Sequence, residues 1–149
     1  MSIVIRPAIE ADYDAVARVW MESWQSLRLP HWQEASIPDS RARIPLEIAN
    51  GWHLYVADDG GTIAAMLAFR TRDNFLDQIF VAPAYQGYGL GKRLLALVRE
   101  HLSDEILLRA DTRNAKAIAW YEREGFVREN EVLEPQWDAP RVYYRWRKS

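Results

Sequence analysis

The sequence predicts a single α/β domain, residues 1–149, built on one mixed sheet with helices on both faces. Three observations predict this fold class. Short runs rich in β-branched and aromatic residues alternate with amphipathic stretches, in the order β-α-α-β-β-β-α-β-α-β-β. Asp58-Asp59-Gly60-Gly61 is a strong hairpin signal between two such runs. A glycine-rich loop at 86–91 joins a strand directly to a helix.

The N-terminal third is predicted to hold one strand and two helices. Residues 2–6 alternate weakly as a strand, and a proline ends it. A helix follows from about Ala11, because apolar residues recur at spacings of three and four as far as Leu27. After a stretch interrupted by prolines, a weaker helix is expected over residues 39–49.

The middle of the chain is predicted to form three strands, at 52–57, 62–70 and 75–81. Side chains alternate between the two faces of a strand. In the third strand, this alternation predicts one face made of Phe75, Asp77, Ile79 and Val81, and an opposite face made of Leu76, Gln78 and Phe80.

The C-terminal part begins with the helix that follows the glycine-rich loop. Leucine and valine recur at helical spacing from Leu90 to Leu102, which predicts an apolar stripe against the sheet. A short second helix is expected after Asn114, a good N-cap, and before Gly125. The remaining strands are expected at 105–110, 126–132 and 141–146.

Composition excludes several classes of function. The chain has no cysteine, which rules out disulfides, thiolate metal sites and a cysteine nucleophile. Its three histidines show no metal-binding spacing, so no metal is expected. A net charge of -2 disfavours nucleic acid as a partner. No apolar run suits a membrane helix or a signal peptide, so the expectation is a cytoplasmic protein without membrane contact.

The glycine-rich loop, Gln86-Gly87-Tyr88-Gly89-Leu90-Gly91, is suited to binding phosphate. Glycines allow close approach of a ligand to the backbone, and the first N–H groups of a helix have no partner within it. A simple turn that needs positive φ is the alternative explanation. Two common phosphate motifs do not fit, because Lys92 stands where a dinucleotide-binding loop needs glycine and Arg93 where a Walker loop needs a hydroxyl.

Two sequence blocks resemble the GCN5-related N-acetyltransferase (GNAT) superfamily. The first is Gln86-x-x-Gly89-x-Gly91 after a strand that ends in Val81-x-Pro83. The second is Asn114-x-x-Ala117-x-x-x-Tyr121-Glu122-Arg123-x-Gly125-Phe126. The resemblance is close over residues 75–126 and covers the first strand and helix in outline, whereas residues 20–50 and 130–141 match no subfamily. It implies the GNAT fold, with a mostly antiparallel sheet of about six to seven strands, and acetyl-CoA as co-substrate.

The resemblance also implies roles for individual residues. The main chain of Ile79, Phe80 and Val81 would bind the pantetheine arm, as an added strand binds a sheet edge. The pyrophosphate would be held, mostly by backbone N–H groups, at Gln86, Gly87, Gly89, Leu90, Gly91 and Lys92. Asn114 would contact the pantetheine through its side-chain amide, and Tyr121 would lie near the thioester sulfur.

Transfer of acetyl to an amine needs an acid for the departing thiolate and a base for the attacking ammonium. The resemblance places Tyr121 near the sulfur, to which a tyrosine can donate, so Tyr121 is the predicted acid. Asp77 is the predicted base, although it could instead pair with an arginine on the sheet. Asp73, Glu22 and His53 are the other candidates, and proton loss to bulk solvent would need no base at all.

The acceptor is expected to be a small-molecule amine, attacked in a ternary complex, because no nucleophile for an acyl-enzyme is apparent. Trp24, Trp32 and Asp73 are its candidate contacts, since aromatic rings suit apolar or cationic ligands. A protein N-terminus or lysine is the alternative acceptor, and a sensor that binds acyl-CoA without turnover is the alternative function. Exposed final strands suggest a homodimer.

Overall fold

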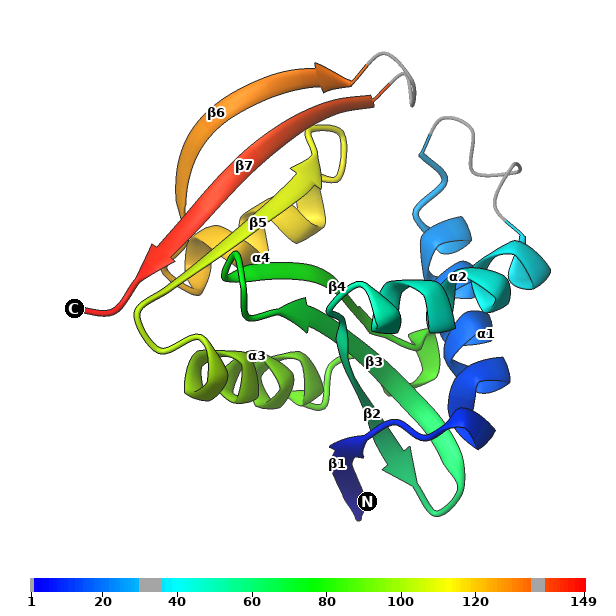
Figure 1. Cartoon of the computed structure of the whole chain (residues 1–149). Coiled ribbons are helices and arrows are strands. Elements are labelled where there is room, and N and C mark those ends of the chain that lie inside the picture. The colour runs from blue at the N-terminus through cyan, green and yellow to red at the C-terminus, as the bar shows by residue number, and fades with distance from the viewer. Residues whose placement is uncertain (1, 30–35, 135–138) are drawn as a thin grey trace.

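The computed structural model of the chain describes residues 2–29, 36–134 and 139–149. Its strands form one sheet in the order β1-β2-β3-β4-β5-β7-β6 (Figure 1). The strands are β1 (Ile3–Pro7), β2 (His53–Asp59), β3 (Thr62–Arg70), β4 (Phe75–Val81), β5 (Glu105–Asp111), β6 (Val127–Glu134) and β7 (Ala139–Arg147). Only β4 and β5 pair in parallel, so the sheet is mixed and mostly antiparallel, as predicted.

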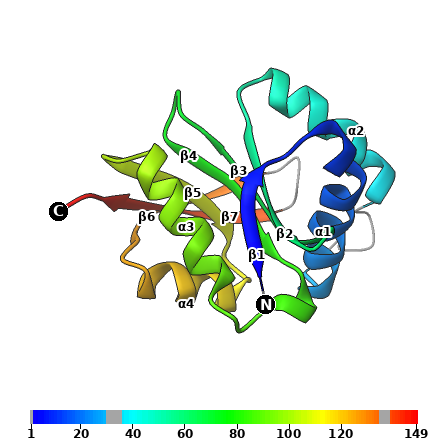
Figure 2. The ribbon, with the colours of Figure 1, turned by 90° about the horizontal axis from the view of Figure 1, so that it is seen from below.

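Helices cover both faces of this sheet (Figure 2). They are α1 (Tyr13–Ser26), α2 (Ile37–Ala49), α3 (Leu90–His101) and α4 (Ala115–Arg123), with short 3-10 turns at Glu10–Asp12 and Pro83–Tyr85. The apolar stripes of α1 and α2 pack on one face, and those of α3 and α4 on the other. No helix in the described part of the chain is long and apolar enough to cross a membrane.

The second helix, α2, begins two residues earlier than the sequence suggested. Ser36 precedes the helix, and its hydroxyl oxygen accepts a hydrogen bond from the Asp39 N–H at 3.2 Å. Pro38 lies in the first turn, where a missing N–H costs nothing. Pro38, one of the prolines expected to interrupt the chain before this helix, therefore lies within the helix and favours its start.

The expected alternation along β4 is wrong, because the strand contains a β-bulge. In the pairing with β3, Ala68 lies opposite Gln78 and the next residue, Phe69, lies opposite Leu76, so Asp77 has no partner of its own. Leu76 consequently packs in the same core as Ile79 and Val81 on the α3 side. Asp77 instead contacts Trp52, which belongs to the core beneath α1 and α2.

The parallel pair β4 and β5, at the centre of the sheet, meets at one end only (Figure 1). Phe75 pairs with Leu107, and the Leu107 N–H donates to the Asn74 carbonyl at 2.8 Å. No later residue of β4 pairs with β5 in the described chain. The main chain of β4 from Asp77 to Val81 therefore keeps one unpaired edge, which faces the gap between the two strands.

Candidate functional site

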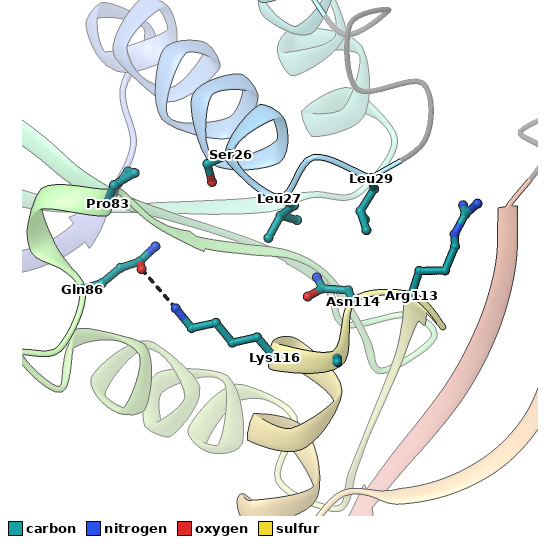
Figure 3. A pocket seen from close by; sticks show the side chains of 9 residues that line it. Ser26, Leu27, Leu29, Pro83, Gln86, Arg113, Asn114 and Lys116 are labelled. Carbon is teal, nitrogen blue, oxygen red and sulfur yellow. Dashed lines mark hydrogen bonds between the residues drawn. The ribbon is translucent and has the colours of Figure 1, made fainter.

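A cleft of about 460 Å³ lies between the end of α1, the end of β4 and the start of α4 (Figure 3). These three segments are distant in the sequence and meet where β4 and β5 have separated. Its walls are formed by Ser26, Leu27, Leu29, Pro83, Gln86, Arg113, Asn114, Ala115 and Lys116. Two of the sequence-predicted cofactor residues, Gln86 and Asn114, therefore lie on opposite walls of one cleft.

The glycine-rich loop presents backbone donors at the start of α3. Gly87 and Gly89 have φ values of +88° and +78°, a conformation that residues with a Cβ rarely adopt. The first hydrogen bond of the helix runs from the Arg93 N–H to the Gly89 carbonyl at 3.2 Å. The N–H groups of Leu90, Gly91 and Lys92 therefore have no partner within the helix.

Gly91 is required for a different reason from the other two loop glycines. It lies inside α3 with ordinary helical geometry, and a Cβ there would stand 3.3 Å from the ring of Trp120 on α4. This glycine lets α3 and α4 pack closely, which the sequence analysis attributed to approach of a ligand.

The basic side chains that follow the loop are engaged away from the cleft. Lys92 forms an ion pair with Glu124 at 3.0 Å, and Arg93 donates to the Ile3 carbonyl at 2.9 Å. Neither residue is among the cleft-lining residues. Lys92 therefore offers its backbone N–H at the loop, while its exposed side chain pairs with Glu124 at the end of α4.

Two amide side chains shape the walls. The Asn114 Oδ1 accepts a hydrogen bond from the Ala117 N–H at 3.3 Å, which confirms the predicted N-cap of α4. Its Nδ2 has no acceptor among the described residues. Gln86 donates through Nε2 to the Val81 carbonyl at 3.1 Å, and its Oε1 accepts from Lys116 at 3.3 Å. The sequence analysis missed Lys116; its place two residues after Asn114, on the exposed start of a helix, was the available signal.

The predicted pantetheine strand presents its main chain rather than its side chains. Ile79 and Val81 pack against the core on the α3 side, while Phe80 packs against the core on the α1 side. One main-chain edge of this segment pairs with β3. The other edge is the one that β5 leaves unpaired.

Tyr121 lies half-buried on α4, next to Trp120 and Phe126, with ring centroids at 5.3 Å and 5.7 Å. Its burial raises the pKa of the phenol to about 12. The hydroxyl has no hydrogen-bond partner within residues 2–29, 36–134 and 139–149. A half-buried tyrosine whose hydroxyl bonds no group of the described chain is suited to donate to a ligand.

Asp77 is held by two side chains on the other face of the sheet. Its Oδ2 accepts a hydrogen bond from the Trp52 indole Nε1 at 2.8 Å, and it lies 3.5 Å from an Arg70 nitrogen. The side chain is only 7% exposed. The arginine pairing that the sequence analysis kept as an alternative is therefore present, and Asp77 and Tyr121 approach the sheet from opposite faces.

The other candidate polar side chains are engaged on the surface. Asp73 accepts hydrogen bonds from Arg70, with the shortest at 3.0 Å, and these bonds lower the pKa of its carboxyl. Glu22 lies 3.8 Å from Arg18 along α1, and both side chains are exposed. His53 stacks on Phe69 with centroids 5.4 Å apart. None of the three lines the cleft.

The aromatic candidates for the acceptor pocket are only partly described. Trp24 is half-buried and packs against the core beneath α1 and α2. Trp32 lies outside the described residues. Within the described ranges, no cluster of three or more histidine, aspartate or glutamate side chains could hold a metal ion.

Comparisons with known proteins agree with this geometry. Residues 13–126 match the model of the acetyltransferase (GNAT) family. The peptidyl-lysine N-acetyltransferase YiaC of Escherichia coli is 28% identical over 127 residues, which cover 83% of this chain and 82% of that protein.

Solved structures share the fold over nearly the whole chain. The paia N-acetyltransferase of Thermoplasma acidophilum, in complex with coenzyme A, superposes with a TM-score of 0.83 at 19% identity and covers 99% of this chain and 100% of that one. The yncA protein of Salmonella typhimurium, with acetyl-CoA, gives a TM-score of 0.74 at 16% identity and coverages of 99% and 94%. Together with the family match over most of its length, these findings establish that the chain belongs to the GNAT family and is an acetyl-CoA-dependent N-acetyltransferase.

Proposed function

We propose that the chain transfers the acetyl group of acetyl-CoA directly to a primary amine of a small molecule, with both substrates bound at once. The observation that carries this proposal is the separation of β4 from β5 after a single residue pair, beside the start of α3. Where two parallel strands separate, the main-chain groups of one strand edge become available to a ligand, and the space between the strands can hold it. The described residues supply no cysteine or other evident nucleophile for an acyl-enzyme, which favours direct transfer.

Groups in and beside the cleft fit each part of acetyl-CoA. Free N–H groups and the positive end of the α3 dipole suit the phosphates. The edge of Ile79–Val81 that β5 leaves open suits the amides of pantetheine, which can add to it as a strand does. The Asn114 Nδ2 suits a carbonyl of the same arm, because its Oδ1 is already used as the helix cap.

We assign the role of general acid to Tyr121. Attack by the amine breaks the bond between the acetyl carbon and sulfur, and the thiolate that leaves must be protonated. With a pKa of about 12, Tyr121 stays protonated at neutral pH and can donate to the sulfur as its charge develops. The proton lost by the attacking nitrogen restores the phenol through solvent.

The role of base falls to Asp77, acting through water. It lies two residues after Phe75, which forms the β4–β5 pair of the described chain, and we place the acetyl end of the gap there. Its contacts with Trp52 and Arg70 fix the carboxylate on the sheet face opposite Tyr121. The attacking amine would thus lose its proton towards the Asp77 face, and the departing sulfur would receive a proton from the Tyr121 face. If its role is only that of an ion pair, the attacking amine loses its proton to bulk solvent.

A small acceptor is supported by the walls of the cleft. Ser26, Leu27 and Leu29, at and beyond the end of α1, close one side of it. Trp24, two residues before Ser26 on α1, and Asp73 stay proposed contacts for an amine-bearing ligand. A peptide lysine is the second candidate acceptor, because the E. coli relative is a peptidyl-lysine N-acetyltransferase.

The test is an assay of thiol release from acetyl-CoA with a panel of small primary amines and a matched panel of lysine peptides. We expect turnover with at least one small amine and little with the peptides. Turnover with the lysine peptides alone would contradict a small-molecule acceptor and would identify a peptide lysine as the acceptor. Acetyl-CoA binding without turnover on either panel would contradict both proposed acceptor classes.

A further inference from the structure

Lys116 extends from the start of α4 into the cleft (Figure 3). It is the second residue of the helix, so its long side chain can reach across to the β4–α3 loop. The ammonium nitrogen lies 3.3 Å from Gln86 Oε1 on the opposite wall. This hydrogen bond joins the two walls of the cleft at the glycine-rich loop.

The other cations near the cleft are already paired with protein groups. Lys92 binds Glu124 and Arg93 binds the Ile3 carbonyl, both away from the cleft. Arg113 lines the cleft, but its Nε and one terminal nitrogen bind the two oxygens of Asp111 at 2.8 Å and 2.7 Å. Lys116 differs from all three, because no carboxylate of the described residues forms an ion pair with it.

The partner that Lys116 does have is weak. A neutral amide oxygen at 3.3 Å is a poorer acceptor for an ammonium group than an anionic oxygen is. The Nε2 of Gln86 also donates a hydrogen bond to the carbonyl of Val81, the last residue of β4. A phosphate that entered beside the start of α3 would therefore compete successfully for the lysine.

We infer that the Lys116 side chain binds a phosphate group of coenzyme A and is the cation that selects the phosphorylated cofactor over pantetheine. The inference rests on binding of acetyl-CoA in the cleft, as proposed above. Gln86 then holds Lys116 over the loop until a phosphate takes its place. The shared chemistry is a phosphate monoester or diphosphate, which coenzyme A carries at its 3′ position and in its pyrophosphate bridge.

The test is calorimetric titration of the full chain and its variants with coenzyme A at low salt. We expect Lys116→Gln to weaken binding by about tenfold, the usual effect of losing one charge-assisted hydrogen bond. Lys116→Arg should keep most of the affinity, because it retains the cation. Lys148→Gln, the same charge change on an exposed lysine near the C-terminus, should stay within about twofold of wild type.

Titration with 3′-dephospho-coenzyme A identifies the phosphate. If Lys116→Gln loses nothing further with this probe, the lysine serves the 3′-phosphate; if it loses the same factor as before, the lysine serves the pyrophosphate. Wild-type affinity in Lys116→Gln for both probes would overturn the inference. Failure of the wild type to bind either probe would instead overturn the proposed cofactor cleft.

Discussion

The two ends of the proposed acetyl-CoA site differ in which groups form them. At the phosphate end, the main features are backbone groups of one continuous segment, the loop and first turn of α3. At the proposed acetyl end, the acid and base are side chains from α4 and β4, and the base is held by Trp52, just before β2, and by Arg70 at the end of β3. A backbone motif formed by neighbouring residues can be predicted from the sequence, whereas an arrangement of side chains from separate elements cannot.

The largest effect is expected at the acetyl end, from Tyr121→Phe. Removal of a general acid should lower kcat by about 10²-fold or more, while acetyl-CoA binds with unchanged Kd. Steady-state kinetics together with titration calorimetry separates the two quantities. Tyr13→Phe, which keeps its ring contact with Arg41 on α2, serves as the control and should be fully active. An unchanged kcat in Tyr121→Phe would show that Tyr121 is not the general acid.

Asp77→Asn tests whether the other acetyl-end side chain is a base or a structural ion pair. A base predicts a kcat lower by about 10²-fold, with an unchanged melting temperature. A structural role predicts instead a lower melting temperature with normal kcat, because Arg70 loses a charged partner. Measurement of both quantities on the same preparation decides between them.

At the phosphate end, Gly89→Ala should act through the backbone. A Cβ has free space there, but the positive φ costs about 1–2 kcal/mol for a residue with a side chain. The altered first turn should also weaken acetyl-CoA binding. Gly60→Ala, in the β2–β3 hairpin, has positive φ and equally free space far from the cleft. Equal loss of acetyl-CoA affinity in both variants would contradict a specific role for Gly89.

Gly91→Val sharpens the distinction among the loop glycines. Because a Cβ at this site already approaches Trp120, the larger side chain should cost about 1–3 kcal/mol of folding stability. Trp120→Leu should relieve part of that cost in the double variant, as measured by urea unfolding. Full additivity of the two substitutions would show that the glycine is not needed for this packing.

The smallest effect concerns pH. The pKa of Tyr121 is raised to about 12 from an ordinary value near 10, so the folded state holds this proton more tightly than the unfolded state. The resulting stabilisation is complete below about pH 10 and is lost as pH rises towards 12. The stability of wild type should therefore fall relative to that of Tyr121→Phe over that interval, because only the wild type carries the titrating phenol. Parallel curves throughout would contradict the raised pKa.

The sequence predicted the order of strands and helices because turn residues and periodicity are local. It also predicted the N-cap at Asn114 and the loop donors, which depend on neighbouring residues only. It did not predict the bulge at Asp77, since strict alternation gives no sign of an unpaired residue. Lys116 escaped notice for a similar reason, because its partner Gln86 lies thirty residues away.

The central claim is that acetyl-CoA binds in the gap between β4 and β5, with its phosphates at the start of α3. Calorimetry tests this claim most directly. Wild-type protein is titrated with acetyl-CoA and, separately, with acetyl-pantetheine, which carries the same thioester but no phosphate. The account predicts clear binding of acetyl-CoA and much weaker binding of acetyl-pantetheine. Equal affinity for both ligands, or none for acetyl-CoA, would contradict it.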